Sequence, residues 1–212
     1  KILAEQVEGI DIIVGGHSHT QLNEPVVVDA EDTPTIIVQA YQYNDFLGTL
    51  DVEFDHNGVV AKHAGQLIKI ADKAEDAEAA QILTQYSSKV NEIKNQESGA
   101  GAVKTLENPR SESNNVRKNE TPLGNLITDG MLEKAKLYNQ NVIMAFQNGG
   151  GIRAGINEGP ITIGEIITVL PFGNTLATMN LTGAEINATF EISLGTLPRD
   201  HGGFRPVSGA KV

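Results

Sequence analysis

The sequence of 212 residues predicts an α/β fold in two parts that one helix connects. Three observations predict it. Short β-branched runs fill the chain up to about residue 70, as in the last part of a layered α/β unit. A stretch rich in Ala, Glu and Gln follows with helical spacing, and after it helix-start signals alternate with short apolar runs. We therefore expect three segments, at 1–72, 73–98 and 99–212.

The first segment is expected to consist mainly of strands. Residues 1–4 read as helix, and residues 10–14 form a short β-branched run that predicts a buried strand ending at Gly15 and Gly16. Further strands are expected at 25–28, 35–40 and 47–54. The string Asp-His-Asn-Gly at 55–58 predicts a hairpin into residues 59–70.

The middle segment predicts an amphipathic helix from Asp76 to about Asn95. Its apolar face is formed by Ile82, Leu83, Tyr86, Val90 and Ile93. The string Ser-Gly-Ala-Gly at 98–101 is expected to end the helix. Two interpretations are open: a connector between domains, or a core helix of one domain.

The second half carries three helix-start signals. Thr121 can cap a helix that has Pro122 at its first position. Its expected buried stripe is Leu123, Leu126, Ile127, Met131 and Leu132. Capping boxes at Thr162 and Thr182 start two more helices, and Pro171 stops the first of these. Residues 141–146 predict a short apolar strand.

Composition excludes several classes of protein and of site. With 27 acidic and 16 basic side chains the net charge is -11, so the overall field repels nucleic acid polymers and anionic membranes, and any phosphate ligand needs a local basic site. The absence of cysteine excludes disulfides, zinc–thiolate sites and a cysteine nucleophile. No apolar run approaches the roughly 18 residues of a membrane span. The chain starts inside a helix pattern without a signal peptide, so we expect an internal piece of a larger polypeptide.

Gly-Gly-His-Ser-His at 15–19 places two imidazoles directly after a strand. Ligands of α/β proteins bind at the carboxyl ends of strands, and glycines let the backbone approach them closely. Neutral imidazole binds first-row divalent metals, so His17 and His19 are candidate metal ligands. Two histidines do not complete the coordination shell of a metal ion, and none of the other histidines stands in a sequence context that marks it as a further ligand. A polar loop with exposed histidines is the alternative.

Asn-Gly-Gly-Gly-Ile-Arg at 148–153 is the second unusual string. Three glycines permit positive φ and expose backbone N–H groups, and Arg153 adds a planar cation suited to phosphate. The string therefore predicts an anion cradle, although it has neither the Walker nor the dinucleotide spacing. The alternative is a tight glycine turn with a surface arginine.

Two further segments can contact a nucleotide. Phe172, between proline and glycine, can offer its face to a flat ligand, with Asn174 beside it; core packing of the ring is the alternative. Arg117 lies in a basic segment with Arg110 and Lys118, where a phosphate ester would be tolerated, and a solvated charged loop is the alternative.

Taken in order, these strings resemble the bacterial 5'-nucleotidase family. Residues 12–19 look like the last metal-binding motif of its metallophosphoesterase domain. Residues 120–127, 148–153 and 171–175 look like three successive motifs of its C-terminal substrate-binding domain. The resemblance implies the end of a four-layer α/β/β/α metallophosphoesterase domain, a linker helix, and the first part of an α+β 5'-nucleotidase C-terminal domain.

The resemblance also implies roles for single residues. His17 and His19 match ligands of a two-metal site that takes divalent Zn, Mn, Mg or Co. Arg117 and Arg153 match arginines that face the phosphate and ribose, and Asn148 and Gly150 belong to the substrate-binding glycine motif. Phe172 matches one of two rings that clamp the base, and Asn174 matches a base contact.

The remaining metal ligands and the catalytic His–Asp pair of the family lie upstream of the motif at 12–19, and the second clamp ring lies beyond Val212. The chain itself thus contains no catalytic residue of the family, and we expect it to be inactive alone. The expected reaction of the intact protein is hydrolysis of nucleoside 5'-monophosphates by a secreted or periplasmic hydrolase of nucleotide catabolism. Alternatives are a 2',3'-cyclic nucleotide phosphodiesterase, a nucleotide-sugar or NAD pyrophosphatase, and a non-catalytic nucleoside-binding module. The oligomeric state stays open.

Overall fold

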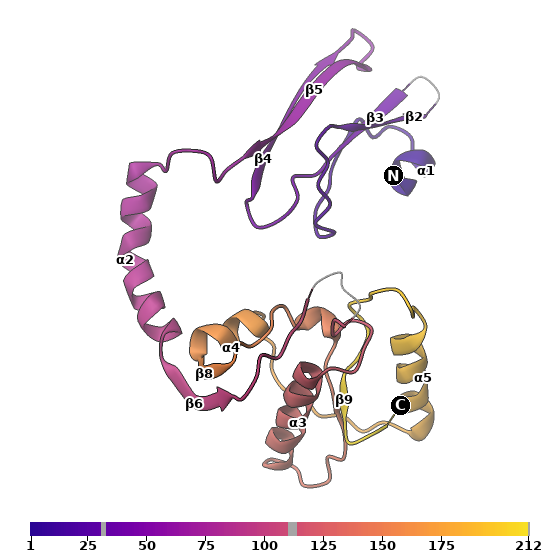
Figure 1. Cartoon of the computed structure of the whole chain (residues 1–212). Helices are drawn as coiled ribbons and strands as arrows, with labels where there is room; N and C mark the ends of the chain where they lie inside the picture. Colours follow the sequence, from indigo (N-terminus) through magenta and orange to yellow (C-terminus); the bar gives the residue numbers. More distant parts are fainter. Residues whose placement is uncertain (31–32, 110–113, 212) are drawn as a thin grey trace. The chain divides into compact units, whose positions relative to one another are not determined.

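The computed structural model describes residues 1–30, 33–109 and 114–211 as a mixed α/β chain (Figure 1), which confirms the predicted fold class. The chain divides into two compact units, Lys1–Ala80 and Gln81–Val212. Within the described residues, no helix has both the length and the apolarity to cross a bilayer.

The first unit begins with a small sheet covered by a short helix. Its elements are α1 (Ile2–Gln6), β1 (Ile12–Val14), β2 (Val26–Ala30) and β3 (Thr33–Val38). The strand order is β1-β3-β2, with β1 parallel and β2 antiparallel to β3. Ala4, Val28 and Ile37 form its core. The expectation that β1 is buried is wrong: β1 is an edge strand, and Val14 at its end is 79% exposed.

A long hairpin completes this unit. Strands β4 (Phe46–Phe54) and β5 (Val60–Lys69) pair antiparallel, as the turn signal predicts. The Asp55 carboxylate accepts from the backbone N–H groups of Asn57 at 2.8 Å and Val59 at 2.9 Å. These bonds close the turn and lower the pKa of Asp55.

Helix α2 (Ala77–Lys94) lies within the predicted helical segment. Asp76 caps it by accepting from the Ala79 N–H at 2.9 Å. None of its residues is buried, and the predicted apolar face is between 45% and 66% exposed from Ile82 to Ile93. The exposure is typical of a connector, and both interpretations of the helix remain predictions.

The second unit packs two small sheets with helices. Its elements are β6 (Glu97–Ala102), α3 (Pro122–Lys136), β7 (Ala145–Phe146), the 3₁₀ turn η1 (Gly149–Gly151), β8 (Gly159–Thr162), α4 (Ile163–Val169), α5 (Gly183–Leu194) and β9 (Val207–Ser208). β6 pairs with β8, and β7 pairs with β9 beside α3 (Figure 1). The core is formed by Val116, Leu123, Ile152, Ile156, Ile161 and Val169.

All three predicted helix starts are present. Thr121 accepts from the Gly124 N–H at 3.1 Å, and Thr162 and Thr182 each form the complete capping box with Glu165 and Glu185. α4 ends at Val169, two residues before Pro171.

The prediction that the segment at 98–101 ends the helix is confirmed, and this segment forms strand β6, which pairs with β8. Two predictions in this unit are wrong in detail. The strand expected at 141–146 covers only Ala145–Phe146. Leu126, expected in the buried stripe of α3, is 49% exposed, whereas Leu123 is fully buried.

Candidate functional site

Two loops leave the same edge of the first unit's sheet. β1 and β3 run parallel, with Ile12 opposite Ile36, so residues 15–20 and 39–45 both follow the carboxyl ends of strands. The Gly15 N–H donates to the Val38 carbonyl at 2.8 Å and extends the pairing by one residue. The predicted histidine loop therefore lies where α/β proteins bind ligands.

The backbone of both candidate metal ligands is strained. His17 has φ 63° and His19 has φ 55°, a region that costs a residue with a Cβ roughly 1–2 kcal/mol. Throughout the described ranges, the other non-glycine residues with positive φ are Tyr41, Tyr43 and Asn44, all in the second loop. Strain of this kind concentrates at functional sites, so it singles out these two loops.

A ring contact joins the two loops. The His19 and Tyr43 rings meet edge to face, with centroids 5.3 Å apart and planes at 66°. His19 is half-buried, whereas His17 is exposed. The contact fixes the plane of the His19 imidazole and leaves the His17 imidazole open to a ligand.

The two imidazoles suit a divalent metal, because neutral ring nitrogen is a ligand that zinc, manganese and cobalt accept. Among residues 1–30, 33–109 and 114–211, no group of three or more His, Asp or Glu side chains lies close enough to hold a metal ion. His17 and His19 alone could therefore supply only part of a metal ligand set.

The glycine string in the second unit is a packed turn, and the predicted anion cradle is wrong. Its N–H groups already donate within the chain: Gly149 to the Phe204 carbonyl at 2.7 Å, Gly150 to the Gly202 carbonyl at 2.9 Å, and Gly151 to the Asn148 carbonyl at 2.9 Å. None of the three glycines has positive φ. These donors are unavailable to a phosphate, so any anion contact here must come from side chains.

Close approach explains why glycine occupies these positions. A Cβ on Gly149 would lie 2.5 Å from the Val116 carbonyl oxygen, and one on Gly150 would lie 3.0 Å from the Cα and the carbonyl oxygen of Gly202. The alternative interpretation, a tight turn required by packing, is therefore the observed one.

Arg153 follows this turn and reaches the Phe172 ring. The side-chain Nη1 of Arg153 donates to the Gly150 carbonyl at 3.2 Å, and the backbone N–H of Arg153 donates to the Val169 carbonyl at 2.8 Å. The guanidinium carbon lies 5.8 Å from the Phe172 ring centroid. Phe172 is 52% exposed, so its ring is not a core side chain.

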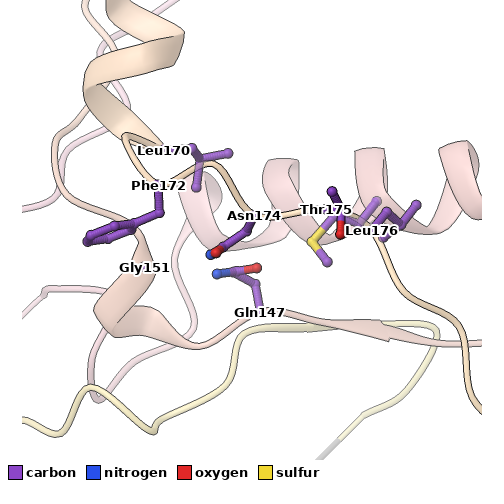
Figure 2. Close-up of a pocket in the computed structure, with 8 residues that line it drawn as sticks. Gln147, Gly151, Leu170, Phe172, Asn174, Thr175 and Leu176 are labelled. Carbon is purple, nitrogen blue, oxygen red and sulfur yellow. The ribbon is translucent and has the colours of Figure 1, made fainter.

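A hollow of about 220 Å³ opens beside this pair. Its lining is Met131, Gln147, Gly151, Leu170, Phe172, Asn174, Thr175 and Leu176. Figure 2 shows the amide groups of Gln147 and Asn174 pointing toward each other, with the Phe172 ring at one end of the group. The hollow thus combines an exposed ring with amides that can both donate and accept.

Gln147 was not among the predicted residues. It directly precedes the glycine motif, and its Nε2 donates to Oδ1 of Asn148 at 3.1 Å. Asn148 is exposed and does not line the hollow. The sequence signal that could have identified Gln147 is its place as a polar residue directly after an apolar strand.

Arg117 is half-buried, and a third segment links it indirectly to the same glycine turn. Its carbonyl accepts from the His201 N–H at 3.2 Å, and Gly202 in turn contacts Gly150. Residues 201 and 202 therefore connect Arg117 to the turn that positions Arg153. Sequence inspection missed this segment.

The neighbouring Lys118 forms an ion pair. Its Nζ lies 2.8 Å from Asp200, which also accepts from the Asn115 amide at 2.9 Å. The Lys118 ammonium is the main cause that holds the pKa of Asp200 below its usual value. Lys118 thus stabilises the segment that carries Arg117. Arg110 lies outside the described residues.

Known proteins resemble this chain throughout. Trifunctional nucleotide phosphoesterase protein YfkN of Bacillus subtilis is 44% identical over 210 residues, which cover 98% of the chain and 14% of that protein. Human 5'-nucleotidase is 32% identical over 235 residues, covering 100% of the chain and 40% of that protein. The chain thus spans less than half the length of either relative.

A solved structure shows the same arrangement of elements. The 5'-nucleotidase precursor from Thermus thermophilus matches with a TM-score of 0.74 and 39% identity, over 98% of this chain and 43% of that one. The family model described as the 5'-nucleotidase C-terminal domain matches residues 99–212, which is more than half of the chain. The chain therefore belongs to the 5'-nucleotidase family.

Proposed function

We propose that this chain is part of a metal-dependent hydrolase of nucleotide phosphate esters, with nucleoside 5'-monophosphates as substrates. The observation that carries the proposal is the exposed Phe172 ring, which lies beside Arg153 and lines the hollow with Asn174. A ring that can stack on a base and a cation that can bind phosphate are two features that suit a nucleotide.

The hollow suits a nucleobase. Its 220 Å³ is below the roughly 300–1,000 Å³ of pockets that enclose a whole small ligand, so it fits one planar part of a ligand. Phe172 would stack on the base, and the amides of Gln147 and Asn174 would form hydrogen bonds with the polar edge of the base. Asn148 and Gly150 would place the ribose, since they continue the same turn.

The phosphate would be held by side-chain cations. In a chain of net charge -11, Arg117 and Arg153 are cations joined through one packed turn. Their planar guanidinium groups bind phosphate oxygens in pairs, and holding the nucleotide in one orientation contributes to the rate of the reaction.

His17 and His19 would hold divalent metal as neutral nitrogen ligands. When bound, such metal ions would lower the pKa of a water molecule and neutralise charge on the phosphoryl oxygens. Zinc, manganese, magnesium and cobalt are all candidates.

We place the domain boundaries at 1–72, 73–98 and 99–212, with α2 as the linker, and its lack of buried side chains supports that role. Export of the protein is proposed from the family resemblance.

Two assays test the proposal. Binding of AMP to the 212-residue chain is measured by calorimetry, and phosphate release from AMP is measured with Mn²⁺ or Zn²⁺ present. We expect the chain to bind AMP without hydrolysing it, and a natural longer protein containing it to release phosphate. A chain that binds neither AMP nor adenosine contradicts the nucleotide-binding part. Binding without phosphate release by the longer protein would make it a nucleoside-binding module.

The name of the Bacillus relative favours a wider substrate range as a second candidate. That protein is called a trifunctional nucleotide phosphoesterase. Assaying the longer protein with 2',3'-cyclic AMP, a nucleotide sugar and NAD beside AMP separates the alternatives. A preference for AMP supports the 5'-nucleotidase proposal, and a preference for a cyclic nucleotide or a pyrophosphate contradicts it.

A further inference from the structure

We infer that Gln39 is a positioning residue that holds His17 and His19 in the conformation in which they bind metal. The inference rests on the proposed metal role of the two histidines. Gln39 directly follows β3 and is 9% exposed, so its amide needs partners within the protein. Those partners all lie in the histidine loop.

The Gln39 side-chain amide forms hydrogen bonds with several polar groups of that loop. In the amide orientation that satisfies the hydrogen bonds, its oxygen accepts from the Thr20 N–H at 2.8 Å, from the Ser18 hydroxyl at 2.9 Å and from the His19 N–H at 3.2 Å. Its nitrogen lies 3.2 Å from the Ser18 hydroxyl oxygen. One side chain thus bonds three consecutive residues, of which the central one is a proposed metal ligand.

The loop needs such support because its backbone is strained. The Ser18 N–H donates to the Gly16 carbonyl at 2.7 Å across His17, whose φ is 63°, which is the rare type of γ-turn. His19 is also at positive φ, so two residues of the loop have a backbone conformation that is unfavourable for a residue with a Cβ. The hydrogen bonds to Gln39 offset this strain.

Gly15 makes room for this amide. In this amide orientation a Cβ at Gly15 would lie 2.6 Å from the Gln39 amide nitrogen, whereas a Cβ at Gly16 would meet no atom within 4 Å. Packing against Gln39 therefore favours glycine at position 15. A side chain at this position would push the amide out from under the loop.

The test compares four variants of the 212-residue chain with the wild type by residue-resolved NMR. Gln39→Met keeps the shape of the side chain and removes its hydrogen bonds. Gln39→Glu keeps the acceptor oxygens, Gly15→Ala displaces the amide, and Gln66→Met makes the matched change on the exposed strand β5. Amide exchange at His19 and Thr20 and a titration with ZnCl₂, followed at the His17 and His19 rings, are recorded for each.

In Gln39→Met and Gly15→Ala we expect the Thr20 amide to exchange roughly tenfold faster and the apparent Kd for zinc to rise by a similar factor, because a smaller fraction of the loop is competent to bind. Gln39→Glu and Gln66→Met should stay within about twofold of the wild type. Unchanged signals of Ile36 and Ile37 show that the sheet is intact in each variant.

Unchanged zinc binding in both Gln39→Met and Gly15→Ala would overturn the inference while leaving the proposed metal role in place. A failure of Gln39→Glu to retain zinc binding would also overturn it, because the acceptor oxygens are what the inference requires. A wild-type chain whose His17 and His19 rings do not respond to zinc would contradict the metal role itself, and the inference with it.

Discussion

The Arg153 guanidinium carbon lies 5.8 Å from the centre of the Phe172 ring, although 18 residues separate them in sequence. Helix α4 and the bond from the Arg153 N–H to the Val169 carbonyl fold the intervening chain back on itself. A cation beside the face of an aromatic ring contributes about 0.5–1 kcal/mol at an exposed site. The pair is thus arranged before any nucleotide binds.

Replacing either member of this pair should weaken nucleotide binding in a distinct way. Arg153→Ala is expected to weaken AMP binding by about 1.5–3 kcal/mol, because it removes a charge-assisted contact, and to affect adenosine less. Phe172→Leu should weaken AMP and adenosine alike by about 1–3 kcal/mol through lost stacking. Calorimetry on the 212-residue chain measures both. Phe54→Leu, at a 49% exposed ring on β4, is the matched control, and an equal loss there would refute the role of Phe172.

Two glycine substitutions should change stability in opposite directions. Gly149→Ala places a Cβ 2.5 Å from the Val116 carbonyl oxygen, so it should lower the free energy of unfolding by about 1–3 kcal/mol. Gly130→Ala in α3 meets no atom within 4 Å and should raise that free energy by about 0.5–1 kcal/mol. Urea unfolding measures both. Tolerance of Gly149→Ala would show that the turn does not need its close approach.

The Asp200 contacts should make stability depend on pH. The Lys118 ammonium, and to a smaller extent the Asn115 amide, hold the pKa of Asp200 below 3.8 in the folded chain. A carboxyl whose pKa is lowered by folding stabilises the chain above its unfolded pKa, and this stabilisation is lost as the pH falls through the folded value. The free energy of unfolding of the wild type should therefore exceed that of Asp200→Asn at pH 7, and the difference should shrink as the pH falls below the unfolded pKa of about 3.9.

Unfolding of both chains in urea from pH 7 to pH 3 measures this difference. Asp51→Asn, at an exposed position on β4, serves as the control and should show no comparable trend. A difference that stays constant with pH would mean that the effect of Asp200 is not electrostatic.

Metal and nucleotide binding should separate between the two units. His17→Ala should remove most of the zinc binding of the chain, because it removes one of the two proposed imidazole ligands. It should leave AMP binding unchanged. Arg153→Ala should do the reverse. Zinc titrations and AMP calorimetry on both variants provide the comparison. If both substitutions lower zinc binding equally, the assigned roles are wrong.

Features of the fold that depend on neighbouring residues were predictable from the sequence. Thr162 bonds Glu165 three residues later, and the Asp55 turn closes within five residues, so each pattern contains its own partners. Strand β6 is different, because the bonds that make it a strand come from β8, about 60 residues later. Its glycines only signalled the end of a helix.

The same distinction applies to the candidate site. The sequence pointed to the glycine string, but not to the partners of the Gly149 and Gly150 N–H groups, which are more than 50 residues away at Phe204 and Gly202. Gln39 lies 21 residues from Ser18 and is a single polar residue at the end of an apolar strand. Its role depends on two loops meeting at one sheet edge, which local patterns do not encode.

We propose that the second unit binds the nucleotide through the segments around η1 and Phe172. Titration of the 212-residue chain with AMP, with every backbone amide followed by NMR, detects this binding residue by residue. We expect saturable shifts at Gln147, Gly150, Arg153, Phe172 and Asn174, and none at His17 or His19 without metal. Saturable shifts confined to the first unit, or no shifts at all, would contradict it.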